Sequence, residues 1–202
     1  MTSPTSASDS PASQDPAGNP RALALCSAGT AIASLIAGTL QVVHTPSGEE
    51  TVVGIEHLML VCLAALMLLQ IPIVLALGRS AGSRWGALVA AAGMMLLTVV
   101  TTVSNVRGRD ASFFAAIAIP ANLLWFAGLV AVAVHTYRRR CLPLALAVLL
   151  PLTWVFTLPL SSLGGGLLAA AYWGVLGWML WTRSLPLAGS AAPIVPGQKA
   201  SA

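Results

Sequence analysis

The chain has 202 residues, of which 57% are hydrophobic and only 8% are charged, and its formal net charge is +4. A soluble domain usually carries about 25% charged residues, so this composition, with a mean hydropathy of +0.85, excludes an ordinary soluble protein. We predict an integral membrane protein whose first partner is the lipid bilayer. The basic residues stand at the ends of apolar stretches, so we expect no nucleic-acid partner.

The two ends of the chain differ in composition from the rest. The first twenty residues, MTSPTSASDSPASQDPAGNP, are rich in Ser, Pro, Ala and Asp and show no hydrophobic periodicity. Such a segment cannot bury enough apolar surface to offset the entropy lost on ordering. We therefore predict disordered cytoplasmic tails at 1–20 and 184–202, with a single transmembrane domain at 21–183 between them.

Apolar stretches of about 20 residues, the length that crosses a bilayer as a helix, recur six times in this domain. Backbone groups in lipid must be hydrogen-bonded internally, so helices are the expected spanning elements. Short connections make successive helices antiparallel neighbours. We predict an all-α, up-down bundle of six transmembrane helices. The predicted spans are about 22–43, 54–77, 85–106, 113–136, 141–160 and 164–182.

The distribution of Arg and Lys predicts the orientation, because cytoplasmic loops carry the excess of these residues. With the N-terminus inside, the cytoplasmic side holds Arg21, Arg79, Arg84, Arg138, Arg139, Arg140, Arg183 and Lys199. The outer side holds only Arg107 and Arg109. We predict a multi-pass protein of a bacterial inner membrane with both termini in the cytoplasm. The bacterial origin is indicated by the excess of Ala, Leu and Arg over Ile and Lys.

Small residues mark contact faces between helices in lipid, because the hydrophobic effect contributes little when such helices meet. The first predicted span repeats small or weakly polar residues at spacings of three and four: Ser27, Thr30, Ser34, Gly38 and Gln41. The sixth span carries Gly166, Ala170 and Gly174, which predicts a helix-packing face. We expect that face to pack against another helix of the bundle or, alternatively, to form the contact in a homo-oligomer or with another membrane protein.

Glu56 and His57 begin the second predicted span on its outer side, within the stretch GIEHLML. Ionisable groups in a span are costly and usually face the bundle interior or a water-filled cavity. Adjacent residues of a helix point about 100° apart, so the two side chains need not form a dyad. Gln70 returns to within about 40° of Glu56, so we expect these two to share an inward face.

Polar residues in other spans extend this idea. Thr101 and Asn105 lie in the outer half of the third span, and Asn122 lies near mid-depth in the fourth. We predict an outward-facing polar pocket formed by Glu56, His57, Thr101, Asn105 and Asn122. The competing interpretation is structural, because a Thr in a span often bonds to its own helix backbone. Glu56 would then interact with the helix dipole or with an arginine of the next outer loop.

The histidines and cysteines form no recognisable metal or haem motif. His44 and His57 lie at a similar depth, but His44 is predicted in a loop, and a zinc site with the acidic loop residues has little support. The three cysteines show no CxxC spacing and lie in or beside apolar runs. We predict no disulfide, no metal site and no cofactor.

No established catalytic motif occurs, so we assign no catalytic residue and expect a non-enzymatic function. The favoured hypothesis is an accessory, small-ligand-binding or transport-associated membrane subunit. The first alternative is an intramembrane enzyme on a lipid or isoprenoid-like substrate with Glu56 as general acid, although the spans offer no second carboxylate. The second alternative is a sensor, immunity or interaction partner that uses the face of Gly166, Ala170 and Gly174.

Overall fold

A computed structural model of the chain describes residues 19–44, 52, 54–110 and 112–185. All regular structure in these ranges is helical, which confirms the predicted all-α class. The helices are α1 Pro20–Val43, α2 Ile55–Ala81, α3 Arg84–Arg107, α4 Phe114–Arg138, α5 Leu144–Thr157, the short 3-10 helix η2 Ser161–Leu163 and α6 Gly165–Trp181. The predicted disordered tails lie outside the described residues, apart from their inner ends.

Four helices of the described chain, α1 to α4, are long and apolar enough to cross a membrane. The other two are apolar but shorter, with 14 residues in α5 and 17 in α6. At about 1.5 Å per residue they extend over roughly 21 and 26 Å, less than the hydrocarbon core of about 30 Å. Membrane insertion is thus supported by four helices, where the sequence predicts six spans.

Prolines shorten α5 relative to the predicted span at 141–160. Pro143 directly precedes its first residue, and Pro159 follows its C-terminal cap residue Leu158. Because proline has no N–H, Pro159 cannot donate the next helical hydrogen bond. Leu160 N instead bonds the carbonyl of Val155, 3.0 Å away, and η2 leads to Gly164, whose φ of 82° turns the chain into α6.

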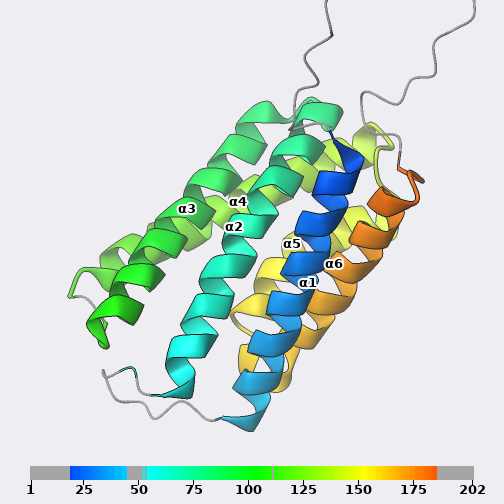
Figure 1. Cartoon of the computed structure of the whole chain (residues 1–202). Helices are drawn as coiled ribbons and strands as arrows, with labels where there is room; N and C mark the ends of the chain where they lie inside the picture. The colour runs from blue at the N-terminus through cyan, green and yellow to red at the C-terminus, as the bar shows by residue number, and fades with distance from the viewer. Residues whose placement is uncertain (1–18, 45–51, 53, 111, 186–202) are drawn as a thin grey trace, which may run out of the picture.

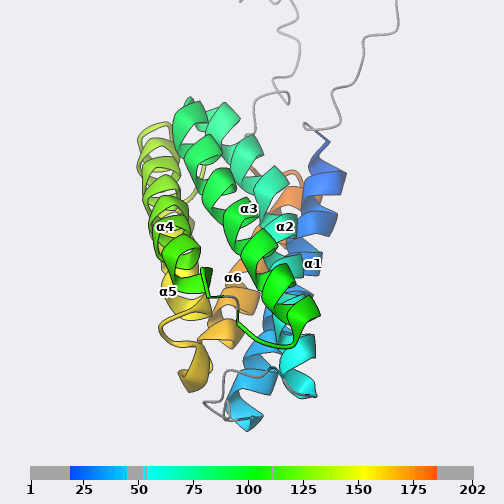
Figure 2. The same ribbon diagram turned by 90° about the vertical axis from the view of Figure 1, so that its left-hand side faces the viewer.

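The helices form a closed ring in chain order. Each α-helix packs against the next, and α1 packs against α6, so the first and last helices are neighbours. Figure 1 shows this pair on the right of the bundle and α3 and α4 on its left, and Figure 2 views the bundle from the left-hand side of Figure 1, with α6 behind α3. The start of α1 and the end of α6 lie at the same end of the molecule (Figure 1).

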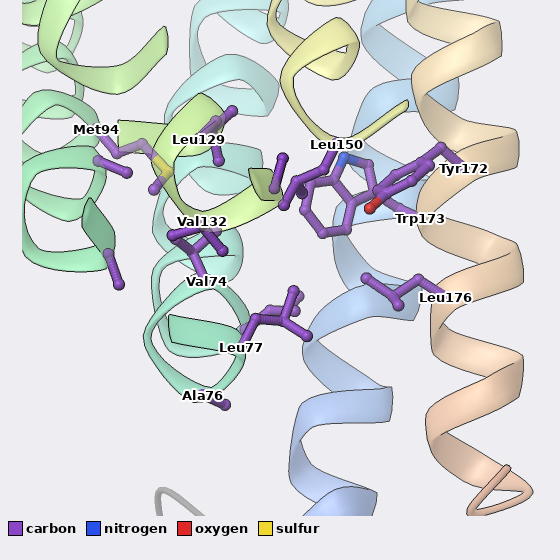
Figure 3. Packing of buried hydrophobic residues seen from close by; sticks show 14 of the residues in the cluster. Val74, Ala76, Leu77, Met94, Leu129, Val132, Leu150, Tyr172, Trp173 and Leu176 are labelled. Carbon is purple, nitrogen blue, oxygen red and sulfur yellow. The ribbon is translucent and has the colours of Figure 1, made fainter. Parts of the chain in front are cut away.

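One continuous apolar cluster fills the ring. Its largest fully buried side chains are those of Trp125 on α4 and Trp173 on α6. Figure 3 shows part of the cluster, with side chains from α2, α3, α4, α5 and α6 turned toward one another. Inside lipid such a core stabilises mainly through close packing, because the surrounding tails are as apolar as the core itself.

Small residues bring α1 and α6 into close contact, as the first-span stripe predicts. Ser27, Thr30, Ser34 and Gly38 are all buried, and the Ser27 hydroxyl donates to the carbonyl of Trp173 at 2.7 Å. A Cβ placed on Gly166 would lie 2.6 Å from the Cα of Gly38, so no side chain fits between the two backbones. We call this contact the α1–α6 seam.

The predicted packing face of α6 is only partly in this seam. Gly166 is buried there, Ala170 is half-buried, and Gly174 is exposed, with no atom of the described residues within 4 Å of an added Cβ. Gly177 takes its place, since its added Cβ would lie 3.2 Å from the Cβ of Ser27. Residues four apart drift by about 40° around a helix, so Gly174 stands about 80° from Gly166, whereas Gly177 stands about 20° away.

Candidate functional site

Four polar side chains gather at the end of the bundle where α1 ends, α2 begins and α3 ends. They are His44, Glu56, His57 and Asn105, which we call the polar cluster. His44 caps α1 and is fixed by its backbone N–H, which donates to the carbonyl of Leu40 at 2.8 Å. The cluster therefore rests on three helix ends rather than on a loop.

The shortest contact in the cluster joins α2 to α3. Nδ1 of His57 lies 2.7 Å from Oδ1 of Asn105. With the amide oxygen accepting, Nδ1 carries the hydrogen, and Nε2 of the neutral ring is left as a hydrogen-bond acceptor. His57 and Asn105, both predicted pocket residues, are thus brought together directly.

Glu56 faces His44, not His57. Oε1 of Glu56 lies 3.7 Å from Nε2 of His44, and the two side chains are 17% and 37% exposed. This matches the expectation that adjacent Glu56 and His57 point apart on their helix. Glu56 also lies in the first turn of α2, where the helix dipole favours a negative charge by up to about 1 kcal/mol.

A backbone contact holds the same end together. The N–H of Val52, in the connection between α1 and α2, donates to the carbonyl of Gly108 at 2.8 Å. Gly108 has a φ of 65° and ends α3 just after Asn105, a conformation that glycine adopts without strain. The connection is thereby tied to the α3 end that carries Asn105.

Thr101 lies one helical turn from Asn105 and is 2% exposed. Its neighbours on α3 behave as the structural interpretation expects, because Thr98 donates to the carbonyl of Met94 and Thr102 to that of Thr98, at 2.8 and 2.7 Å. Thr101 is therefore a buried residue beneath the polar cluster and not part of its open rim.

Asn122 belongs to a different contact. Its Nδ2 donates to the carbonyl of Ala118 at 2.8 Å, and its Oδ1 accepts from Nε1 of Trp154 at 3.0 Å. The amide nitrogen bonds within α4, and the amide oxygen joins α4 to α5. The predicted five-residue pocket is thus divided between the polar cluster and this separate Asn122–Trp154 pair.

A second group of polar atoms lies in the interior of the ring. Gln70 is fully buried, as its predicted inward face requires, and neither of its amide atoms has a hydrogen-bond partner among the residues that the structure describes. The same holds for the buried polar atoms of Ser34, Ser104, Trp125 and Trp173. A lone amide in an apolar environment costs about 1–3 kcal/mol in protein mutational series. Sequence reasoning missed the two tryptophans because indole counts as apolar in hydropathy.

The chemistry open to the polar cluster is hydrogen bonding and charge interaction. Over the described residues, no three His, Cys, Asp or Glu side chains are grouped to hold a metal ion. The 3.7 Å between Glu56 and His44 exceeds the distance of about 2.6–3.2 Å at which a side chain transfers a proton directly. In this geometry Glu56 and His44 are therefore not placed for direct proton transfer to each other.

A separate apolar groove lies between α1 and α6 on the surface of the bundle. Its volume is about 440 Å³, and Ile32, Gly174, Trp178 and Trp181 are among its lining residues. The two tryptophans are 69% and 55% exposed. None of the described residues that line this groove is charged.

Comparisons with protein families, curated proteins and solved structures find no match for the chain.

Proposed function

We propose that this chain is a non-enzymatic membrane protein that binds a small polar ligand, as an accessory or transport-associated subunit, at its polar cluster. The observation that carries the proposal is the convergence of His44, Glu56, His57 and Asn105 from three helix ends. Helical membrane proteins place ionisable groups where they face a cavity or a partner, because such groups are costly in lipid.

The chemistry of the cluster defines the ligand class. The carboxylate of Glu56 and the Nε2 of His57 accept hydrogen bonds, and the carboxylate adds negative charge. A small molecule with an amine or hydroxyl donor fits this arrangement. Because Glu56 is the carboxylate among the four, it is the side chain on which recognition of an amine depends.

The proposed setting is the inner membrane of a bacterium, crossed six times with both termini in the cytoplasm. Four helices of spanning length and the closed ring of six support this topology. Arginines support the orientation, since seven described ones stand at the end opposite the polar cluster: Arg21, Arg79, Arg84, Arg138, Arg139, Arg140 and Arg183. The polar cluster would then face the outside.

Glu56→Gln is expected to abolish ligand-induced stabilisation without unfolding the chain. The full chain, purified in detergent, is screened by thermal unfolding against small amines, amino alcohols and sugars. A ligand at 100 times its Kd stabilises the fold by about 2.7 kcal/mol, enough to raise the melting temperature by several degrees. We expect at least one amine to raise the melting temperature of the native chain.

Asp110→Asn is the matched control, because Asp110 is the other described carboxylate at this end and is exposed. It should respond to the amine as the native chain does, whereas Glu56→Gln should not. An equal response of both variants, or no response of the native chain to any compound, would refute the proposed function.

A second candidate function, assembly with another copy in the membrane, is favoured by the α1–α6 groove. Gly174 leaves room there for an incoming helix, and small residues let helix backbones approach closely. Under this function Gly174→Leu would lower the oligomeric mass in detergent and leave the protomer folded.

A further inference from the structure

A hollow at the turn between α2 and α3 combines two positive charges with apolar walls. Its volume is about 240 Å³, and it is lined by Leu75, Arg79, Arg84, Ala87 and Leu88. It lies at the end of the bundle opposite the polar cluster. The hollow is therefore separate from the ligand site that we propose at the polar cluster.

The local sequence fixes the shape of this hollow. Gly82, with a φ of 73°, ends α2, and the N–H of Ser83 donates to the carbonyl of Gly78 at 2.7 Å. A Cβ on Gly78 would collide with the Cβ of Ala87, so the two helices touch closely just beyond the turn. This tight turn brings Arg79, in the last turn of α2, to the same hollow as Arg84, the first residue of α3.

Both guanidinium groups lack a carboxylate partner within the described residues. The acidic residues there are Glu56 and Asp110, which both lie at the opposite end of the bundle. Five further arginines stand at the same end as the hollow, so its surroundings are strongly positive. An anion is the complementary occupant.

The other half of the hollow is apolar and lies deeper along the helices. Leu75 precedes Arg79 by four residues, and Leu88 follows Arg84 by four, so each leucine lies about 6 Å closer to the middle of the bundle than its arginine. Leu88 is 51% exposed, and the adjacent Trp85 is 82% exposed. Trp side chains of this kind concentrate at the headgroup level of membranes.

We propose that this hollow binds one anionic phospholipid. The phosphate lies between Arg79 and Arg84, where planar guanidinium groups donate paired hydrogen bonds to its oxygens. One acyl chain runs over Leu75 and Leu88 toward the middle of the bundle. Two other occupants fit less well. A second copy of this chain would bring a like positive charge to the hollow and be repelled, and a soluble anion would leave Leu75 and Leu88 uncovered.

Lipid binding to the full chain in detergent tests the proposal. Phosphatidylglycerol or phosphatidylcholine is added at equal concentration, and bound lipid is counted by native mass spectrometry. The test variant is Arg79→Gln with Arg84→Gln. The matched control is Arg138→Gln with Arg139→Gln, which removes the same charge at the same end outside the hollow.

We expect the native chain and the control to prefer phosphatidylglycerol, and the test variant to bind it about thirtyfold more weakly, the combined effect of two arginines at a membrane surface. Arg79→Lys with Arg84→Lys should keep the preference for the anionic lipid, with weaker binding. Free glycerol phosphate at the same concentration should not displace the lipid.

Three results would overturn the proposal. Equal losses in the test and control variants would mean that any surface arginine attracts the lipid. Displacement by free glycerol phosphate would assign the hollow to a soluble anion. An unchanged lipid count in the test variant would show that the hollow holds no lipid.

Discussion

Gly166→Leu is expected to disrupt the native packing of α1 against α6, whereas Gly174→Leu is expected to leave the protomer folded. At Gly166 even a Cβ would lie 2.6 Å from the backbone of Gly38, and that backbone cannot move aside as a flexible side chain can. Overpacking a tight core usually lowers the free energy of unfolding by about 1–3 kcal/mol. We expect a loss of at least about 3 kcal/mol for Gly166→Leu, because two helix backbones must separate.

Thermal unfolding in detergent measures this difference. Gly174→Leu is the matched control, since it makes the same change on the same helix at a position where no described atom lies within 4 Å of the added Cβ. Equal stability of the two variants would mean that the α1–α6 seam is not packed as described.

Gln70→Met is expected to raise the free energy of unfolding by about 1–3 kcal/mol, the cost of a buried amide without a partner. Gln70 is fully buried, and both of its amide atoms lack a hydrogen bond to any described part of the chain. Met has a similar length and flexibility and carries no strongly polar atom, so it can fill the same space without that cost. Denaturant titration in mixed micelles measures the change.

Gln41→Met is the control for this substitution. Gln41 lies in the last turn of α1 and is half-buried, and we expect its replacement to change stability by less than about 0.5 kcal/mol, the usual range for a substitution near the surface. A loss of stability in Gln70→Met, larger than that of the control, would show that the Gln70 amide is satisfied by groups bound in the bundle interior.

The fold class could be predicted because it depends on hydropathy alone. Apolar stretches and short connections suffice to predict helices, their order and approximate ends. The length of α5 is harder to predict, because Pro143 and Pro159 limit the helix within a stretch that remains apolar. Hydropathy measures solubility in lipid, and it does not register a missing backbone N–H.

The polar cluster was only partly predictable, for a geometric reason. Helical angles indicate which face Glu56 and His57 occupy, but not which residue of another helix stands opposite. His44, predicted in a loop, proved to be the α1 cap beside Glu56, and Asn122 proved to face Trp154. These pairings depend on the rotation of each helix within the ring, and no spacing within a single helix encodes that rotation.

The small-residue patterns were also only partly predictive of which residues are buried. The first-span stripe predicted a buried face for four of its five members, with Gln41 half-buried, because mixed spacings of three and four keep residues on one side of a helix. The strict four-residue spacing of Gly166, Ala170 and Gly174 drifts around the helix, and its last member is exposed on the groove side.

Under the topology that we propose, the polar cluster faces the outside of the cell, and the arginine-rich end of the bundle lies in the cytoplasm. Cysteine labelling in intact cells tests this most directly. In a chain whose native cysteines are replaced, Asp110→Cys should react with a membrane-impermeant maleimide, and Arg139→Cys should react only after permeabilisation. Labelling of Arg139→Cys but not Asp110→Cys in intact cells would contradict the account.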